Sequence, residues 1–125
     1  MGSPSYSKAK GRDAENMVVA FLRENSIPAE RRRLAGVQDM GDVAGWASVV
    51  VEIKAEKCMD IAACMDELEV EVANADKRLG GRHLGLAICK RKGKGGDVRA
   101  WYAVLPPSLA VAALKALLRE QGARP

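Results

Sequence analysis

The stretch 49–57, VVVEIKAEK, constrains the fold of this chain more than any other. Its valines and isoleucine are typical of a buried strand, yet the same run carries Glu52 and Lys54. Side chains alternate along a strand, so Glu52 and Lys54 share one face while Val51 and Ile53 share the other. The pattern predicts a carboxylate and an ammonium side by side at the edge of a core, where burial costs free energy unless the pair is satisfied or used.

The length of 125 residues suits one domain, 1–125, in which we expect 1–7 to be a flexible tail. No stretch reaches the roughly 18 apolar residues of a membrane span, and the N-terminus lacks a hydrophobic signal region. The three cysteines form no CxxC pair, which fits reduced thiols in the cytoplasm. A single histidine excludes His-based triads and histidine-rich zinc sites.

Hydrophobic periodicity predicts an α/β domain with the order α-βββ-α-ββ-α. We expect one mixed five-stranded sheet flanked by helices, in which the helix between strands three and four makes that pair parallel. The predicted helices are 8–25, 60–80 and one that begins at 106–108, and the predicted strands are 27–35, 42–44, 48–55, 83–90 and 98–105.

The middle helix has an apolar stripe with a spacing of four and three residues, and Gly80 and Gly81 end it. Two of its acidic residues, Glu69 and Glu71, could line a cleft, but exposed carboxylates are the favoured interpretation. The stripe consists of Ile61, Met65, Leu68, Val72, Ala75 and Leu79.

Acidic residues near the valine-rich strand predict a metal site. Asp42 begins the preceding strand and nine residues separate it from Glu52, so the two carboxylates should meet at one end of the sheet. Mg²⁺ takes one or two such carboxylates and shares phosphate oxygens with a substrate. Lys54 can then orient the attacking water or stabilise charge on the phosphate. Glu15, on the flank of the first helix's apolar stripe, could add a carboxylate.

A basic surface is also predicted. The net charge is +4 and the isoelectric point is about 9.1, which fits a polyanionic partner. Any one basic cluster taken alone is best interpreted as a solvated face, and the three together favour contacts with a DNA backbone. The predicted DNA-binding residues are Lys8, Lys10, Arg12, Arg31, Arg32, Arg33, Lys90, Arg91, Lys92 and Lys94.

Taken together, these motifs resemble the PD-(D/E)xK nuclease superfamily, in particular its small Holliday-junction-resolvase-like members. Phage-type members are the most similar, and the resemblance covers roughly residues 7–105. It rests on KGRDAE at 10–15, RRR at 31–33, GD at 41–42, EIK at 52–54, EVEVANA at 69–75, the turn KRKGKG and the ending WYAVLP.

The resemblance implies a restriction-endonuclease-like core and a Mg²⁺-dependent endonuclease that cuts branched DNA, with Mn²⁺ able to substitute. Asp42, Glu52 and the carbonyl of Ile53 would hold the ion, Lys54 would assist the water, and Glu15 would support a second ion or water. It also implies a homodimer with two active sites, 5′-phosphate products, and a place in the cytoplasm of a bacterial or phage-infected cell.

Two departures from the family pattern stand out. Gly41 replaces the motif's proline, interpreted as tolerated because that proline only shapes a turn. Asn16 stands where archaeal resolvases have an arginine, and Arg12 is expected to take its place.

Three other interpretations stay open. A nuclease of the same fold could act on flaps or duplex ends, and a non-catalytic module could only bind nucleic acid. Alternatively, Glu52 and Lys54 could form an edge-strand salt bridge, with Asp42 as an Asx-turn residue.

Overall fold

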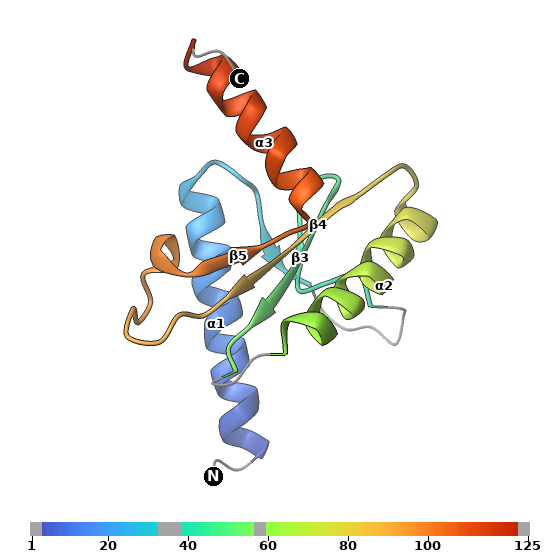
Figure 1. Ribbon diagram of the computed structural model, residues 1–125. Helices are drawn as coiled ribbons and strands as arrows, with labels where there is room; N and C mark the ends of the chain where they lie inside the picture. The colour runs from blue at the N-terminus through green and yellow to red at the C-terminus, as the bar shows by residue number, and fades with distance from the viewer. Residues whose placement is uncertain (1–3, 33–38, 57–59, 123–125) are drawn as a thin grey trace.

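The computed structural model describes residues 4–32, 39–56 and 60–122, with side chains from residue 9 onward (Figure 1). A long first helix precedes two short strands, and a second helix connects two strands of the main sheet. The elements in order are α1 (Pro4–Glu24), β1 (Glu30–Arg31), β2 (Val43–Ala44), β3 (Val49–Lys54), α2 (Ile61–Leu79), β4 (Leu84–Cys89), the 3₁₀ turn η1 (Val98–Ala100), β5 (Tyr102–Val104) and α3 (Pro107–Glu120).

The main sheet has the strand order β3-β4-β5. β3 and β4 are parallel, in register from Val49 opposite Leu84 to Lys54 opposite Cys89, and α2 connects them. This confirms the predicted helical crossover and parallel pair. β5 runs antiparallel to β4 and forms an edge.

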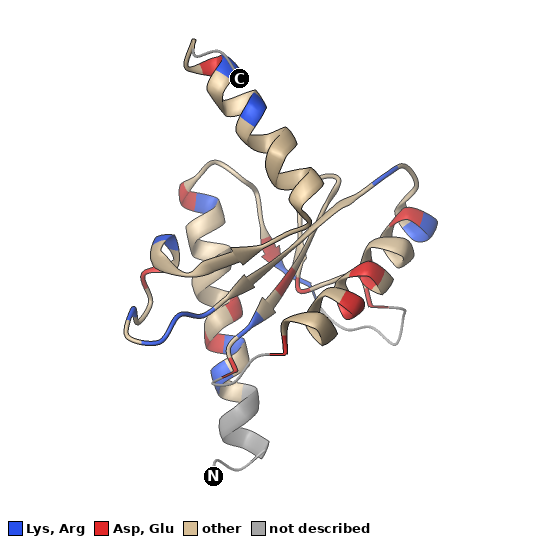
Figure 2. Ribbon diagram, viewed as in Figure 1, with Lys and Arg blue, Asp and Glu red and all other residues tan. Residues whose placement is uncertain are grey.

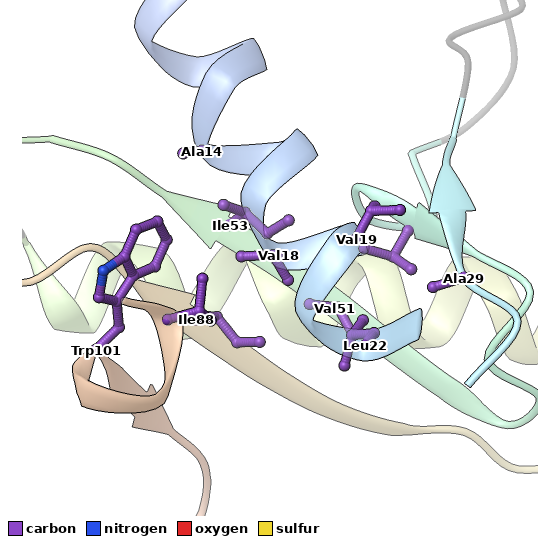
Figure 3. Close-up of a cluster of buried hydrophobic side chains, with 11 residues drawn as sticks. Ala14, Val18, Val19, Leu22, Ala29, Val51, Ile53, Ile88 and Trp101 are labelled. Carbon is purple, nitrogen blue, oxygen red and sulfur yellow. The ribbon is translucent and has the colours of Figure 1, made fainter. Parts of the chain in front are cut away.

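Helices cover both faces of this sheet, and β3 contributes side chains to each side. Val51 and Ile53 pack beneath Val18 and other apolar residues of α1 (Figure 3). Val50, one residue along, is buried against α2. The alternation that the sequence predicts for this strand is therefore confirmed, and the Glu52 face is the one that α2 covers.

The prediction of a single five-stranded sheet is wrong. β1 and β2 form a separate antiparallel pair of two residues each. The link to β3 is a 2.8 Å hydrogen bond from the Asp42 amide to the Val51 carbonyl. Next to it, the Ile53 amide donates a 2.7 Å hydrogen bond to the carboxylate of Asp42. In a continuous sheet this amide would donate to a backbone carbonyl of the neighbouring strand, so the Asp42 side chain replaces a strand-to-strand hydrogen bond.

The predicted strand 98–105 is shorter than expected, because residues 98–100 form the turn η1 and only 102–104 are strand. Val98 and Trp101 are both buried in the core beneath α1. A strand would send side chains three residues apart to opposite faces, whereas a 3₁₀ turn places them on the same side.

The two terminal helices differ in how they pack. α1 begins at Pro4, so residues 4–7, expected to belong to a tail, are helical. α3 begins at Pro107, as predicted, and projects away from the sheet (Figure 1). Within the described residues, no side chain of α3 is buried. Of the helices in the described ranges, none combines the length and apolar character needed to cross a membrane.

Candidate functional site

The structure brings the carboxyl groups of Asp42 and Glu52 into contact with each other beside β3, as predicted. Asp42 Oδ2 accepts the amide of Ile53 at 2.7 Å, which fixes its carboxylate against the strand. The amide and carbonyl of one strand residue point to the same edge, so the Ile53 carbonyl also faces Asp42. The Asp42 carboxyl therefore lies next to both the Ile53 carbonyl and the carboxyl of Glu52, the oxygens expected around a metal ion.

Two further carboxylates, from Asp39 and Glu71, join this group. Asp39, Glu52 and Glu71 each offer an oxygen, and these oxygens lie within 4.8 Å of one another. Asp39 is positioned by two bonds: its Oδ1 accepts the Gly41 amide at 2.9 Å, and its carbonyl accepts Asn74 Nδ2 of α2 at 2.7 Å. Asp39, and not Asp42, is thus the Asx-turn residue. We call Asp39, Asp42, Glu52 and Glu71 the acidic cluster.

The interpretation that both helical carboxylates, Glu69 and Glu71, are exposed is correct for Glu69 and wrong for Glu71. Glu71 is 3% exposed, between Leu68 and Ala75 on the buried face of α2. The buried residues are Cys64, Leu68, Glu71 and Ala75, whereas Ile61 and Leu79 of the predicted stripe are 55% and 58% exposed. The sequence signal was an acid three residues after Leu68 and four before Ala75, at stripe spacing.

Burial shapes the electrostatics of the cluster. Loss of solvent, reinforced by the neighbouring Glu52, raises the pKa of Asp42 to about 8. Loss of solvent and the contact with Glu71 raise the pKa of Glu52 to about 8, although contacts with Asp42 and Lys54 act to lower it. Burial, with the charges of Asp39 and Asp42, raises the pKa of Glu71 to about 7. These groups hold protons near neutral pH unless a cation compensates their charge.

Glu15 lies on the other side of Asp42, as the sequence predicts for a residue between core and cleft. Burial and the charge of Asp42 raise its pKa, and Arg31, 3.3 Å from Glu15 Oε2, opposes this shift. Both residues line a cavity of about 860 Å³, which we call the main cavity. Its other lining residues include Asp39, Asp42, Arg12, Arg23 and Arg32. Carboxylates and guanidinium groups therefore line the same cavity.

The predicted arginine cluster is divided between two environments. Arg31 is exposed, whereas Arg32 Nη2 donates to the Val43 carbonyl at 3.3 Å. The buried Nε of Arg32 has no hydrogen-bond partner in the described part of the chain. This difference agrees with the prediction that the side chains of Arg31 and Arg32 point in opposite directions along their strand. Arg33 and the side chain of Lys8 lie outside the described residues.

Lys54 shares the face of Glu52, as predicted, but its ammonium donates a 2.8 Å hydrogen bond to Glu67 Oε2 of α2. Burial acts to lower the pKa of Lys54, and the hydrogen bond to Glu67 and the charge of Glu52 outweigh it, so the pKa rises. The side chain is therefore a charged hydrogen-bond donor at neutral pH, and not a base.

On the sequence alone, Gly41 is interpreted as a tolerated replacement for a proline that only shapes a turn, but the structure gives this glycine a more specific role. Its φ of +93° is closed to proline, whose ring holds φ near −65°. A Cβ at this position would lie 2.9 Å from both Val50 Cγ1 and the Val51 carbonyl. Glycine is needed for the backbone to pass this close to β3, and this approach carries Asp42 to Glu52.

A second basic site lies where α1 approaches the loop after β4, which Figure 2 shows as largely basic. Lys10, Lys90, Arg91 and Lys92 line a hollow of about 350 Å³, which we call the basic groove. The Arg91 guanidinium lies over the ring of Tyr102, 5.3 Å from its centroid. The structure thus brings together four of the predicted DNA-binding residues.

Four of the described predicted DNA-binding residues, Arg12, Arg31, Arg32 and Lys94, lie apart from this groove. Lys94 is exposed in the same loop and does not line the groove, and the three arginines line the main cavity.

No protein-family model matches the chain, and comparisons with curated proteins and with solved structures found no match.

Proposed function

We propose that the chain is a metal-dependent endonuclease that hydrolyses phosphodiester bonds in DNA, with a four-way junction as its expected substrate. The observation that carries this proposal is the contact between the half-buried carboxyl of Asp42 and the buried carboxyl of Glu52, beside a cavity lined by arginines. Carboxyl groups in such contact need a proton or a cation between them, and oxygen ligands suit Mg²⁺, with Mn²⁺ as a substitute.

Asp42, Glu52 and the Ile53 carbonyl would hold the ion, because the carboxyl of Asp42 contacts that of Glu52 and accepts the amide of Ile53. Mg²⁺ at this position would supply a Lewis acid for the phosphate and lower the pKa of water. In the hydrolysis, water adds to phosphorus and the bond to O3′ breaks, which leaves a 3′-hydroxyl and a 5′-phosphate.

The cationic side chains have separate roles. Lys54 would donate a hydrogen bond to the water or to a phosphate oxygen, for which it must exchange its contact with Glu67. Arg12 and Arg31 of the main cavity would bind phosphates next to the cut bond. Glu15, beside Asp42, would hold a second water or ion.

DNA beyond the cut site would follow the basic groove. Its lysines are within reach of solvent and suit a phosphate backbone, which gives affinity without sequence preference. Symmetric cutting of a junction further requires two active sites, and hence the expected homodimer.

A cleavage assay tests this function. Purified protein is mixed with a labelled four-way junction, a flap, single-stranded DNA or duplex DNA, in Mg²⁺, Mn²⁺ or chelator. Asp42→Asn and Glu52→Gln keep the size of the side chains while removing their charges, and Asp66→Asn, on the exposed side of α2, is the matched control.

The outcomes separate the open interpretations. Paired, metal-dependent nicks across the junction, lost in both site variants and kept in the control, support a resolvase. Cutting of flaps or duplex instead, with the same losses, indicates a nuclease with another substrate. If no DNA is cut and both variants bind DNA at least as tightly as the wild type, the enzyme hypothesis is wrong and the binding module remains.

A further inference from the structure

The most unusual buried group outside the Asp42 contact is the carboxylate of Glu71. Its side chain is 3% exposed, and Oε1 has no hydrogen-bond partner among the residues that the structure describes. A buried, unpartnered carboxylate oxygen is costly, because it has lost its water without a replacement donor. The carboxyl of Glu71 also contacts those of Glu52 and Asp39, which offer further acceptors and no donor when ionised.

We propose that Asp39, Glu52 and Glu71 bind a divalent cation at a position of their own, on the side of Glu52 that faces α2. Glu52 would lie between this ion and the one proposed at Asp42, and could give an oxygen to each. The position does not depend on the proposed nuclease activity, because it follows from the three carboxylates and the unpartnered Glu71 oxygen.

The distances between the ligand atoms fit a hard cation. Two oxygens bound to one ion are at most twice the metal–oxygen distance apart, about 4.2 Å for Mg²⁺ and about 5 Å for Ca²⁺. The three carboxylate oxygens lie within 4.8 Å of one another, which already meets the limit for Ca²⁺. Mg²⁺ would require a small inward movement, which the exposed Asp39 side chain can make.

The three ligands come from three different parts of the fold. Glu52 belongs to β3, Glu71 to α2, and Asp39 to the loop before β2 that Asn74 of α2 already holds. An ion here would therefore fasten α2 and this loop to the central strand. Since Asp39 also lines the main cavity, solvent and ions can reach the position from there.

Binding of Ca²⁺ to the full chain without DNA tests the inference. Titration calorimetry and thermal unfolding at pH 8, after chelator treatment, are carried out on the wild type, Glu71→Gln, Asp39→Asn and Asp42→Asn. Glu69→Gln is the matched control, two residues from Glu71 and exposed on the same helix.

We expect Ca²⁺ to raise the melting temperature of the wild type, Glu69→Gln and Asp42→Asn. Glu71→Gln and Asp39→Asn should each bind one Ca²⁺ fewer than the wild type, or bind that ion about tenfold more weakly or worse, because each loses a charged ligand of this position. Glu71→Gln should also melt higher than the wild type in chelator, since it removes a buried repulsion, so lost binding is not mistaken for misfolding.

Three results would overturn the inference. They are a wild type that does not bind Ca²⁺, a Glu71→Gln variant that binds as the wild type does, and an Asp42→Asn variant that loses binding together with Glu71→Gln. The last would mean one site shared by all four carboxylates. None of these results depends on DNA cutting, so a failure of this inference can be distinguished from a failure of the nuclease proposal, which the cleavage assay tests.

Discussion

Lys54 Nζ lies 2.8 Å from Glu67 Oε2, so the lysine of the EIK motif is paired with α2 and not with a carboxylate of its own strand. Glu67 is 56% exposed, and an ion pair of this kind contributes roughly 0 to 1 kcal/mol to stability. The contact is therefore weak enough to be exchanged for the phosphate or water contact that we propose for Lys54.

Replacement of Lys54 by methionine should lower the cleavage rate about 10²- to 10³-fold, because a charged donor near the developing negative charge is lost. DNA affinity and the melting temperature should change little. Single-turnover cleavage and a binding titration measure the two effects. A rate within a few-fold of wild type would contradict the proposed role.

Glu67→Gln should cut DNA at least as fast as the wild type, because Lys54 loses its competing partner. The same single-turnover assay measures this, with Glu69→Gln as the control on the same helix. A loss as large as that of Lys54→Met would mean that the pair, and not the lysine alone, is needed.

Without metal, the protein should become less stable as the pH rises from about 4 to about 8. The cluster carboxyls have ordinary pKa values of 3.8 to 4.5, whereas the folded values of Asp42 and Glu52 rise to about 8. The folded state therefore binds more protons across this window, so deprotonation favours unfolding. Melting curves in chelator should show the decline, and Mg²⁺ should reverse it at pH 8. A melting temperature in chelator that stays level or rises would contradict this prediction.

Replacing Gly41 by proline, the residue that the nuclease motif has at this position, should harm this chain. Gly41→Pro imposes a φ that conflicts with +93° and removes the amide that Asp39 accepts, at a cost of about 3 kcal/mol or more. Denaturant unfolding measures this cost. Gly41→Ala should lose less stability, since it keeps the amide. Unchanged stability of the proline variant would show that the turn can adopt the family's conformation.

Alanine at both Lys90 and Lys92 should weaken binding of every DNA about equally and reduce the slope of log affinity against log salt by about one for each lost phosphate contact. Lys115→Ala with Arg119→Ala, on the projecting helix, is the charge-matched control. Binding titrations at several salt concentrations test this, and equal slopes for both pairs would contradict a role for the basic groove.

The expected homodimer should depend on α3. Val111, Leu114, Leu117 and Leu118 lie on one stripe and are 36% to 58% exposed, a pattern suited to packing against the same helix of a second copy. Leu114→Glu with Leu117→Glu should give a folded monomer, whereas Val70→Glu, on exposed α2 surface, should not change the mass. Light scattering after size exclusion measures the assembly. A wild-type monomer would contradict this prediction.

Sequence patterns alone predicted the local elements and one part of the site. The valine-rich strand, its alternating faces and the parallel crossover depend on periodicities within one segment, which the chain carries wherever it folds. The meeting of Asp42 and Glu52 followed from a short connection between neighbouring segments.

Tertiary packing decided the rest. The Asp42 side chain accepts the Ile53 amide of β3 in place of a neighbouring strand's carbonyl, and β1 and β2 form a sheet separate from β3. The rotation of α2 about its axis buries Glu71 and exposes Glu69, although both lie in the same stretch of alternating glutamates and valines. Each residue turns a helix by about 100°, so Glu69 and Glu71 point about 160° apart, and the orientation of α2 set by contacts with β3 and the Asp39 loop selects which carboxylate reaches the site.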